Sequence, residues 1–334
     1  RSSDLVLLKC ISMIEKKSRE YEIEDVFRTY GVLTREAGFY FYFSRKIREL
    51  RECGHEGTAR AYASSLRSMQ RYLGKKDFPF IKLSSRIISD YQGKLLASGI
   101  CDNTIGFYLH NIKALFRKGC REMGLELPCP FRDISIKTEK TLKRSLDPVV
   151  IKTLSAIELE KDSPLSLARD IFMFSFYTRG MSFVDIALLK KRHVFPGEIC
   201  YRRHKTDQLM RVGINKEISR ILERYKNVPG EYIFPLFPAE RDPYAGYRSA
   251  YHRIRYSLGK ISRVIGLEFP LRLHAARHSW ATIAKVNGAS VHVIGECLGH
   301  TSEKTTRIYL KELDHSALDA VNNQVADFIL AVDD

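Results

Sequence analysis

The chain has 334 residues, of which 44% are hydrophobic and 28% charged, as is typical of a globular protein long enough for two domains. Its net charge of +16 favours a polyanionic partner, nucleic acid before an acidic membrane surface, over a merely basic protein. No apolar run approaches the length of a membrane span, so we expect no contact with a membrane. The seven cysteines are scattered without a C-x-x-C pair, which argues against zinc sites and a disulfide framework and predicts reduced thiols in a cytoplasm.

The first part of the chain is predicted to be helical. Residues 1–34 read as a short helical segment, and residues 35–136 as a small helical domain that binds DNA. Four helices are expected in this domain: around Phe39–Cys53, after Gly57, from Ser84 or Ser85, and from Asp102 or Asn103 as the cap. The second and fourth helices, with the residues that follow the second, carry cationic side chains and few acidic ones. This pattern favours a surface that faces phosphates over an ordinary solvated face. The candidate DNA-binding residues are Arg60, Arg67, Arg71, Lys75, Lys113 and Arg117.

The second part is predicted to mix helices with a small sheet. Residues 137–148 are polar, basic and only weakly periodic, as is typical of an exposed linker. Residues 149–334 form the second domain. We expect helices near 166–177, 183–189, 215–226 and 243–265, a β-hairpin within 198–214, helices around His274 and Tyr309, and an amphipathic tail helix with Leu318, Val321, Val325 and Phe328 on one face.

Three side chains near the start of one predicted helix point to an anion site. His274, Arg277 and His278 stand at i, i+3 and i+4, hence on one face. Histidines at this spacing can bind zinc, but no glutamate follows His274 and Arg277 would place a fixed positive charge beside the metal. We therefore expect no metal. An arginine presents a rigid fork of donors for phosphate oxygens, and His274 can donate or accept a proton, whereas we expect His278 to be a core histidine.

A second motif adds a nucleophile. Leu298-Gly299-His300 supplies another imidazole, and Tyr309 follows nine residues after His300. A lone tyrosine at helical spacing is usually a core residue. Here, however, a phenol occurs beside phosphate ligands in a strongly basic chain.

H-x-x-R-H, then L-G-H, then Tyr nine residues later resembles box II of the tyrosine recombinase (integrase) family. The resemblance implies a mainly α fold with a small β-sheet, in which a helical core-binding (SAM-like) domain and a mixed α/β catalytic domain form a C-shaped DNA clamp. It implies site-specific recombination (integration, excision or inversion) through a 3′-phosphotyrosyl intermediate, without ATP, metal or other cofactor. The expected state is a homotetramer on two paired double-stranded DNA sites in a bacterial cytoplasm, at the nucleoid. The C-terminal helix would pack on a neighbouring protomer or on its own chain.

The resemblance also implies roles for the box II residues. Tyr309 would attack the scissile phosphate in line, and Arg277 would bind its non-bridging oxygens as charge builds. His274 would hydrogen-bond this phosphate and accept the tyrosine proton, since an unperturbed phenol has a pKa of about 10. His300 would be a further phosphate ligand.

The family carries a lysine general acid on a β-hairpin between its two boxes. Lys205, in the predicted hairpin, is the candidate to protonate the leaving 5′-oxygen. Arg202 or Arg203 as the acid, and a merely solvated Lys205, are open alternatives.

Box I departs from the family pattern T-G-L-R-x-x-E-L. Aligned on Asp185, the arginine position holds Ser182, and Arg179 lies three residues earlier. If the local backbone is helical, these positions share a face, so we expect Arg179 to take the role, with a structural ion pair as the alternative. The G-M-S-F-x-D pattern resembles integrases and invertases of Bacteroidetes mobile elements.

Two other functions compete with recombination. A type IB topoisomerase shares the phosphotyrosine chemistry, although the helical clamp domain and the short spacing from His300 to Tyr309 favour a recombinase. A catalytically inactive DNA-binding regulator on the same fold is supported only by Ser182.

Overall fold

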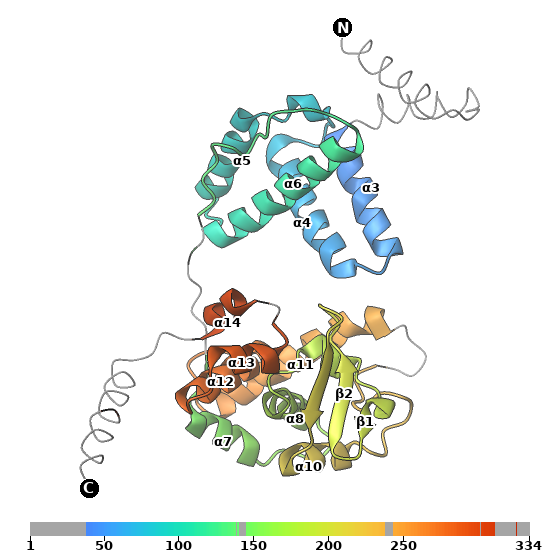
Figure 1. Ribbon diagram of the computed structural model, residues 1–334, viewed down its shortest axis with the longest axis vertical. Coiled ribbons are helices and arrows are strands. Elements are labelled where there is room, and N and C mark those ends of the chain that lie inside the picture. The colour runs from blue at the N-terminus through green and yellow to red at the C-terminus, as the bar shows by residue number, and fades with distance from the viewer. Residues whose placement is uncertain are drawn as a thin grey trace. The chain divides into compact units, whose positions relative to one another are not determined.

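The computed structural model (Figure 1) forms two compact units, Arg1–Thr141 and Leu142–Asp334, called units 1 and 2 below. The structure describes residues 38–137, 139, 145–237, 243–300, 302–310 and 325. Within these ranges, no helix is both long and apolar enough to span a membrane. The predicted segment 1–34 and the apolar stripe of the predicted tail helix, apart from Val325, lie outside them.

The described part of unit 1 contains the four predicted helices. They are α3 (Phe39–Glu52), α4 (Glu56–Leu73), α5 (Ser85–Ala97) and α6 (Asp102–Glu122), with a short 3-10 turn at Phe80–Lys82. Their apolar stripes meet in one core. For example, Ile88, Tyr91 and Leu95 of α5 are fully buried. Ser84 caps α5 by accepting a hydrogen bond from the Ile87 amide, as its position before an apolar stripe predicts.

The predicted cap of α6 was wrong. Cys101 occupies the N-cap position and its side chain accepts no capping bond. Asn103 lies inside the helix and instead exchanges two hydrogen bonds of 3.0 Å with the backbone of Glu139. Because its amide group is hydrogen-bonded to a residue 36 positions away, Asn103 does not cap the start of α6.

Unit 2 holds more elements than the sequence predicted. They are α7 (Pro148–Ala156), α8 (Pro164–Tyr177), α9 (Phe183–Ala187), a 3-10 turn (Lys191–His193), β1 (Val194–Phe195), β2 (Glu198–Arg202), β3 (Leu209–Gly213), α10 (Lys216–Arg224), α11 (Pro243–Val264), α12 (Leu273–Val286), α13 (Val291–Leu298) and α14 (Glu303–Tyr309). The strands form an antiparallel sheet in the order β1-β2-β3, with Cys200 opposite Arg211. The predicted hairpin is thus confirmed, whereas α7, α13 and β1 were not predicted.

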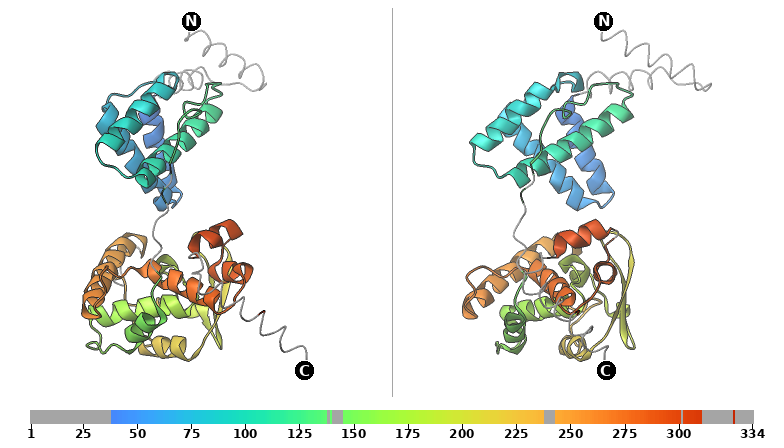
Figure 2. Two further views of the ribbon diagram at one scale, coloured as in Figure 1. Left: turned by 90° about the vertical axis from the view of Figure 1, so that its left-hand side faces the viewer. Right: turned by 60° about the vertical axis from the view of Figure 1, so that its left-hand side comes forward.

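The core of unit 2 is built around α8. Ile171, Phe172 and Phe174 of this helix are fully buried, and α11 and α12 pack against it. In both views of Figure 2, α11 and the β2–β3 hairpin lie on opposite sides of the unit with α12 between them. Near the start of the unit, the Leu146 amide donates a hydrogen bond of 2.7 Å to the Ser279 hydroxyl on α12. The helix with the H-x-x-R-H motif is therefore central to the unit.

Candidate active site

Arg277 is the centre of the site. Its side chain is only 4% exposed. Nη1 donates to the Gly180 carbonyl at 2.7 Å, and Nη2 donates to the Leu298 carbonyl. Nη2 also lies 3.0 Å from Nε2 of His300. The guanidinium therefore joins the turn after α8 to the turn after α13, and its orientation is fixed before any ligand arrives.

Two glycines make this arrangement possible. Gly180 has φ +74°, and a Cβ there would lie 2.6 Å from Cγ and 2.9 Å from Cα of Arg277. Gly299 caps α13 in the left-handed conformation, at φ +63° and ψ +43°. A Cβ on Gly299 would lie 2.9 Å from Sδ of Met210 on β3. Both positions thus combine a glycine-favouring backbone with a close approach, which explains the Leu-Gly-His sequence physically.

His300 is half-buried and is a neutral imidazole near neutral pH. Its Nδ1 lies 3.0 Å from the hydroxyl oxygen of Thr306. Burial lowers the pKa of His300 from 6.5 to about 4, and the positive charges of Arg277, Arg203 and Lys205 add to the effect. Of these residues, Arg277 contacts the His300 ring directly, and Arg203 contacts the residue that precedes it.

Asp185 anchors the loop that carries Lys205. This carboxylate is 5% exposed; Oδ1 accepts from the His204 amide at 2.8 Å and Oδ2 accepts from the Ser182 hydroxyl at 2.6 Å. Lys205 follows directly and is exposed in the turn between β2 and β3. Arg202, an alternative acid in the sequence, is exposed and pairs with Asp207 of the same loop at 3.3 Å.

Arg203 is the residue whose position the sequence reasoning missed. The sequence suggests Arg203 only as an alternative acid to Lys205. In the structure, its Nη1 donates to the Gly299 carbonyl, next to His300 in the chain. This contact joins residues 96 positions apart, so no motif spacing signals it.

The geometric argument for Arg179 was wrong. The helix α8 ends at Tyr177, and Arg179 lies in the following turn with φ +59°, so the backbone between Arg179 and Ser182 is not helical. Arg179 Nη1 lies 3.5 Å from the Arg211 carbonyl on β3. Ser182 occupies the N-cap of α9, and its hydroxyl is engaged by Asp185.

Three arginines nevertheless approach one buried phenol. The pKa of Tyr201 is raised, first by burial and then by the charge of Asp185, while three guanidinium charges act in the opposite direction: Arg277, Arg203 and Arg179. Both the Asp185 carboxylate and three guanidinium groups therefore act on the phenol of Tyr201.

The remaining box II residues lie on α12 and α14. His274 is exposed in the first turn of α12, and its ring meets that of His278 edge-on at 4.7 Å. His278 is only 9% exposed, as expected for a core histidine. Tyr309 is the last residue of α14; its side chain lies outside the described part of the structure.

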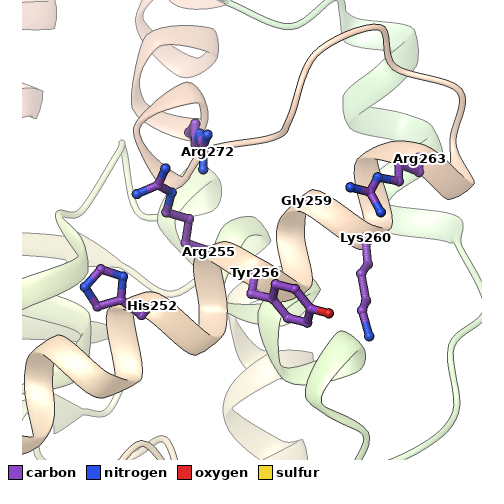
Figure 3. Close-up of a pocket in the computed structure, with 7 residues that line it drawn as sticks. All are labelled: His252, Arg255, Tyr256, Gly259, Lys260, Arg263 and Arg272. Atoms are coloured by element: carbon purple, nitrogen blue, oxygen red, sulfur yellow. The ribbon is translucent and has the colours of Figure 1, made fainter.

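A second cationic feature lies on α11 (Figure 3). A pocket of about 350 Å³ is lined by His252, Arg255, Tyr256, Gly259, Lys260, Arg263 and Arg272. Lys260 Nζ lies 4.8 Å from the centre of the Tyr256 ring. Among described residues, no carboxylate pairs with any of the four Arg and Lys side chains, whereas many cations elsewhere in the unit are paired. The sequence analysis did not single out this face, although residues 252, 255, 256, 259, 260 and 263 stand at one-face helical spacing within the predicted helix 243–265. Only Arg272 comes from another element, α12, where it is the N-cap.

The six candidate DNA-binding residues of unit 1 differ in exposure. Four are exposed at the surface: Arg67, Arg71, Lys75 and Arg117. Arg60 pairs with Glu56 at 3.2 Å, and Lys113 is half-buried with its ammonium 6.0 Å from the centre of the Phe131 ring.

Known proteins share both units. Residues 145–315 match the sequence profile of the phage integrase family, and residues 38–131 match that of the phage integrase SAM-like domain. The tyrosine recombinase XerC of Shewanella oneidensis is 26% identical over 226 residues, covering 65% of this chain and 70% of that protein. XerD of Pseudomonas putida is 24% identical over 262 residues, covering 76% and 86%.

Solved structures share the fold. The Tn1549 transposon integrase bound to transposon right-end DNA has a TM-score of 0.63 at 14% identity and covers 86% of this chain and 99% of that one. A lambda integrase dimer on a COC′ core site has a TM-score of 0.60 at 17% identity, covering 80% and 93%. With the family profile matched over half of its length, this chain belongs to the phage integrase family of tyrosine recombinases and is a site-specific DNA recombinase that cleaves and rejoins DNA strands.

Proposed function

We propose that Tyr309 attacks the scissile phosphate in line, forming the bond from its phenolic oxygen to phosphorus while the bond to the 5′-oxygen breaks. His274 takes the phenol proton, and Lys205 gives a proton to the departing 5′-oxygen. Arg277 and His300 bind the non-bridging oxygens. Strand rejoining reverses each transfer. The observation that carries this proposal is the buried Arg277 guanidinium, fixed by two carbonyls beside His300.

We propose that Arg203, rather than Arg179, supplies the second arginine that box I lacks. The support is its bond to the Gly299 carbonyl and its effect on the pKa of His300. Arg179 instead reaches the backbone of β3. An arginine held at the His300 turn is placed to share the transition-state charge with Arg277, which a serine hydroxyl bonded to Asp185 cannot do.

We infer that duplex DNA contacts the exposed cations of unit 1 and the pocket on α11. The positive charges that line this pocket repel one another, and a phosphate backbone relieves that repulsion by replacing condensed counterions. We propose that the predicted linker, residues 137–148, connects the DNA-contacting units through its first part, because Leu146 is already buried in the core of unit 2 and Pro148 begins α7.

We also infer a homotetramer on two paired sites, because a similar lambda integrase forms a tetramer bound to a Holliday junction. The resemblance to the recombinase family supports exchange of C-terminal helices between protomers, with packing on the same chain as the alternative. The G-M-S-F-x-D segment supports placement in the Bacteroidetes mobile-element and invertase-like branch, acting at the nucleoid of the bacterial cytoplasm.

Covalent capture tests the nucleophile and does not require a defined DNA site. The protein is incubated with a library of nicked duplexes of random sequence, denatured and washed, and the DNA that stays attached is sequenced. We expect one enriched site with the parent chain and none with Tyr309→Phe. Equal recovery with both would overturn the assignment, and no recovery with the parent would favour a DNA-binding regulator. Relaxation of supercoiled plasmid without strand exchange between two captured sites would favour a topoisomerase.

Single-turnover cleavage of the captured site tests the second arginine. Removing one donor of an oxyanion site typically lowers the rate by about 100-fold or more, which we expect for Arg203→Ala. Arg179→Ala and the control Arg202→Ala should cleave within about threefold of the parent, since neither guanidinium is bonded to the His300 turn. A large loss in Arg179→Ala alone would return the role to Arg179.

A further inference from the structure

The hydrogen bonds of His300 define which ring nitrogen carries the proton. A guanidinium can only donate, so Nε2, which lies 3.0 Å from Nη2 of Arg277, must accept. The low pKa of the ring keeps it neutral near neutral pH. Nδ1 therefore carries the hydrogen and donates it to the Thr306 hydroxyl oxygen at 3.0 Å.

Thr306 is built into the interior of the site. Its side chain is 0% exposed, and it lies one helical turn before Tyr309 on α14. A Cβ on Gly295 would lie 2.9 Å from the Thr306 hydroxyl oxygen, so α13 and α14 approach this closely only because Gly295 has no side chain. The Gly295 carbonyl also accepts from the His300 amide at 2.9 Å. One small cluster thus holds the His300 turn and α14 together.

We propose that Thr306 is a positioning residue for strand cleavage, which ties the helix of the nucleophile to the imidazole that binds the phosphate. The inference rests on the proposed roles of Tyr309 and His300. Its first function is to hold the His300 ring in the tautomer that accepts from Arg277, which fixes the guanidinium before DNA binds.

Its second function concerns the bound state. A phosphate anion beside His300 favours the imidazolium, whose Nε2–H can then donate to the phosphate while Arg277 does the same. Nδ1 keeps its hydrogen in both forms, so the bond to Thr306 persists through the change. The hydroxyl therefore holds the ring in one orientation whether the ring is neutral or protonated, and the position of α14 is unchanged.

Histidine ¹⁵N spectra test the tautomer without DNA. In the parent, the His300 signal, assigned by its loss in His300→Gln, should show hydrogen on Nδ1. Thr306→Val keeps the shape of the side chain but removes the hydroxyl, and it should shift the signal towards a mixture of tautomers. Thr306→Ser should restore the parent signal. Hydrogen on Nε2 in the parent, or an unchanged signal in Thr306→Val, would overturn the proposal.

Single-turnover cleavage of the nicked duplex captured with the parent tests positioning. Loss of one hydrogen bond predicts cleavage about fivefold to tenfold slower in Thr306→Val, at unchanged DNA affinity, with recovery in Thr306→Ser. Thr305→Val is the matched control, because Thr305 is the exposed neighbour on the same helix, and it should cleave like the parent.

A double-mutant cycle separates positioning from simple destabilisation. If Thr306 acts through His300, Thr306→Val should change the rate by less than about twofold in a His300→Ala background. An equal loss in both backgrounds, or no loss in the parent background, would refute the proposal. These outcomes differ from failure of the proposed function, which would appear as a parent adduct that survives Tyr309→Phe.

Discussion

Gly259 offers a prediction in which stability and DNA binding move in opposite directions. It lies inside α11 in the pocket lined by four cations that pair with no described carboxylate, and a Cβ there would meet no atom within 4 Å. Its φ is not in the left-handed region, unlike that of Gly180. Neither packing nor backbone geometry within the described structure therefore requires glycine. The open helix backbone suits the close approach of a DNA strand.

The magnitudes follow from helix propensity. Glycine in a helix interior is about 1 kcal/mol less favourable than alanine, so Gly259→Ala should stabilise unit 2 by roughly 0.5–1 kcal/mol. For a unit of about 190 residues this raises the melting temperature by roughly 1–4 °C. The added methyl group also separates DNA from the helix, and we expect affinity to fall by about threefold to tenfold, as for the loss of about 1 kcal/mol of contacts.

Thermal melting and gel shift with a random-sequence duplex at several salt concentrations measure the two effects. Gly93→Ala is the matched control, because Gly93 is an exposed glycine inside α5 with equally open space. It should gain stability without losing affinity. Arg263→Ala should reduce the slope of log affinity against log salt by about 1. If Gly259→Ala bound DNA as tightly as Gly93→Ala at all salt concentrations, the pocket on α11 would not contact DNA.

Three further predictions concern the active site. Asp185→Ala should slow cleavage at least about tenfold, because the His204 amide loses its hydrogen bond to the carboxylate. The control Asp207→Ala, in the same loop, should cleave like the parent, and single-turnover assays compare the two variants. Gly180→Ala should lower the free energy of unfolding by more than about 2 kcal/mol in urea titration, since its Cβ would meet the Arg277 backbone; an effect below about 0.5 kcal/mol would contradict this close approach. Lowering the pH from 6.5 towards 4 should destabilise the parent by an amount on the order of 1 kcal/mol, after allowance for solvent screening, because unfolded His300 takes up a proton in this window and folded His300 does not. His300→Gln should remove this part of the pH dependence.

The sequence determined the parts of this protein that depend on local spacing. The four helices of unit 1 follow from apolar residues at helical period, and the hairpin follows from short alternating strands. The box II residues could also be identified from the sequence, because His274 and Arg277 are three residues apart on one helical face and His300 directly follows Gly299. The family resemblance rested on these same residues.

The tertiary structure decided what depends on contacts between distant segments. Arg203 reaches the Gly299 carbonyl across 96 positions, and Asp185 holds the His204 amide across 19. The Arg179 hypothesis assumed a helix through box I, but the backbone turns at Arg179 and Gly180 with positive φ. The pocket on α11 joins a helix face to Arg272 in the following segment. A periodic pattern reports which face of one element is buried, whereas packing between elements decides which side chains meet there.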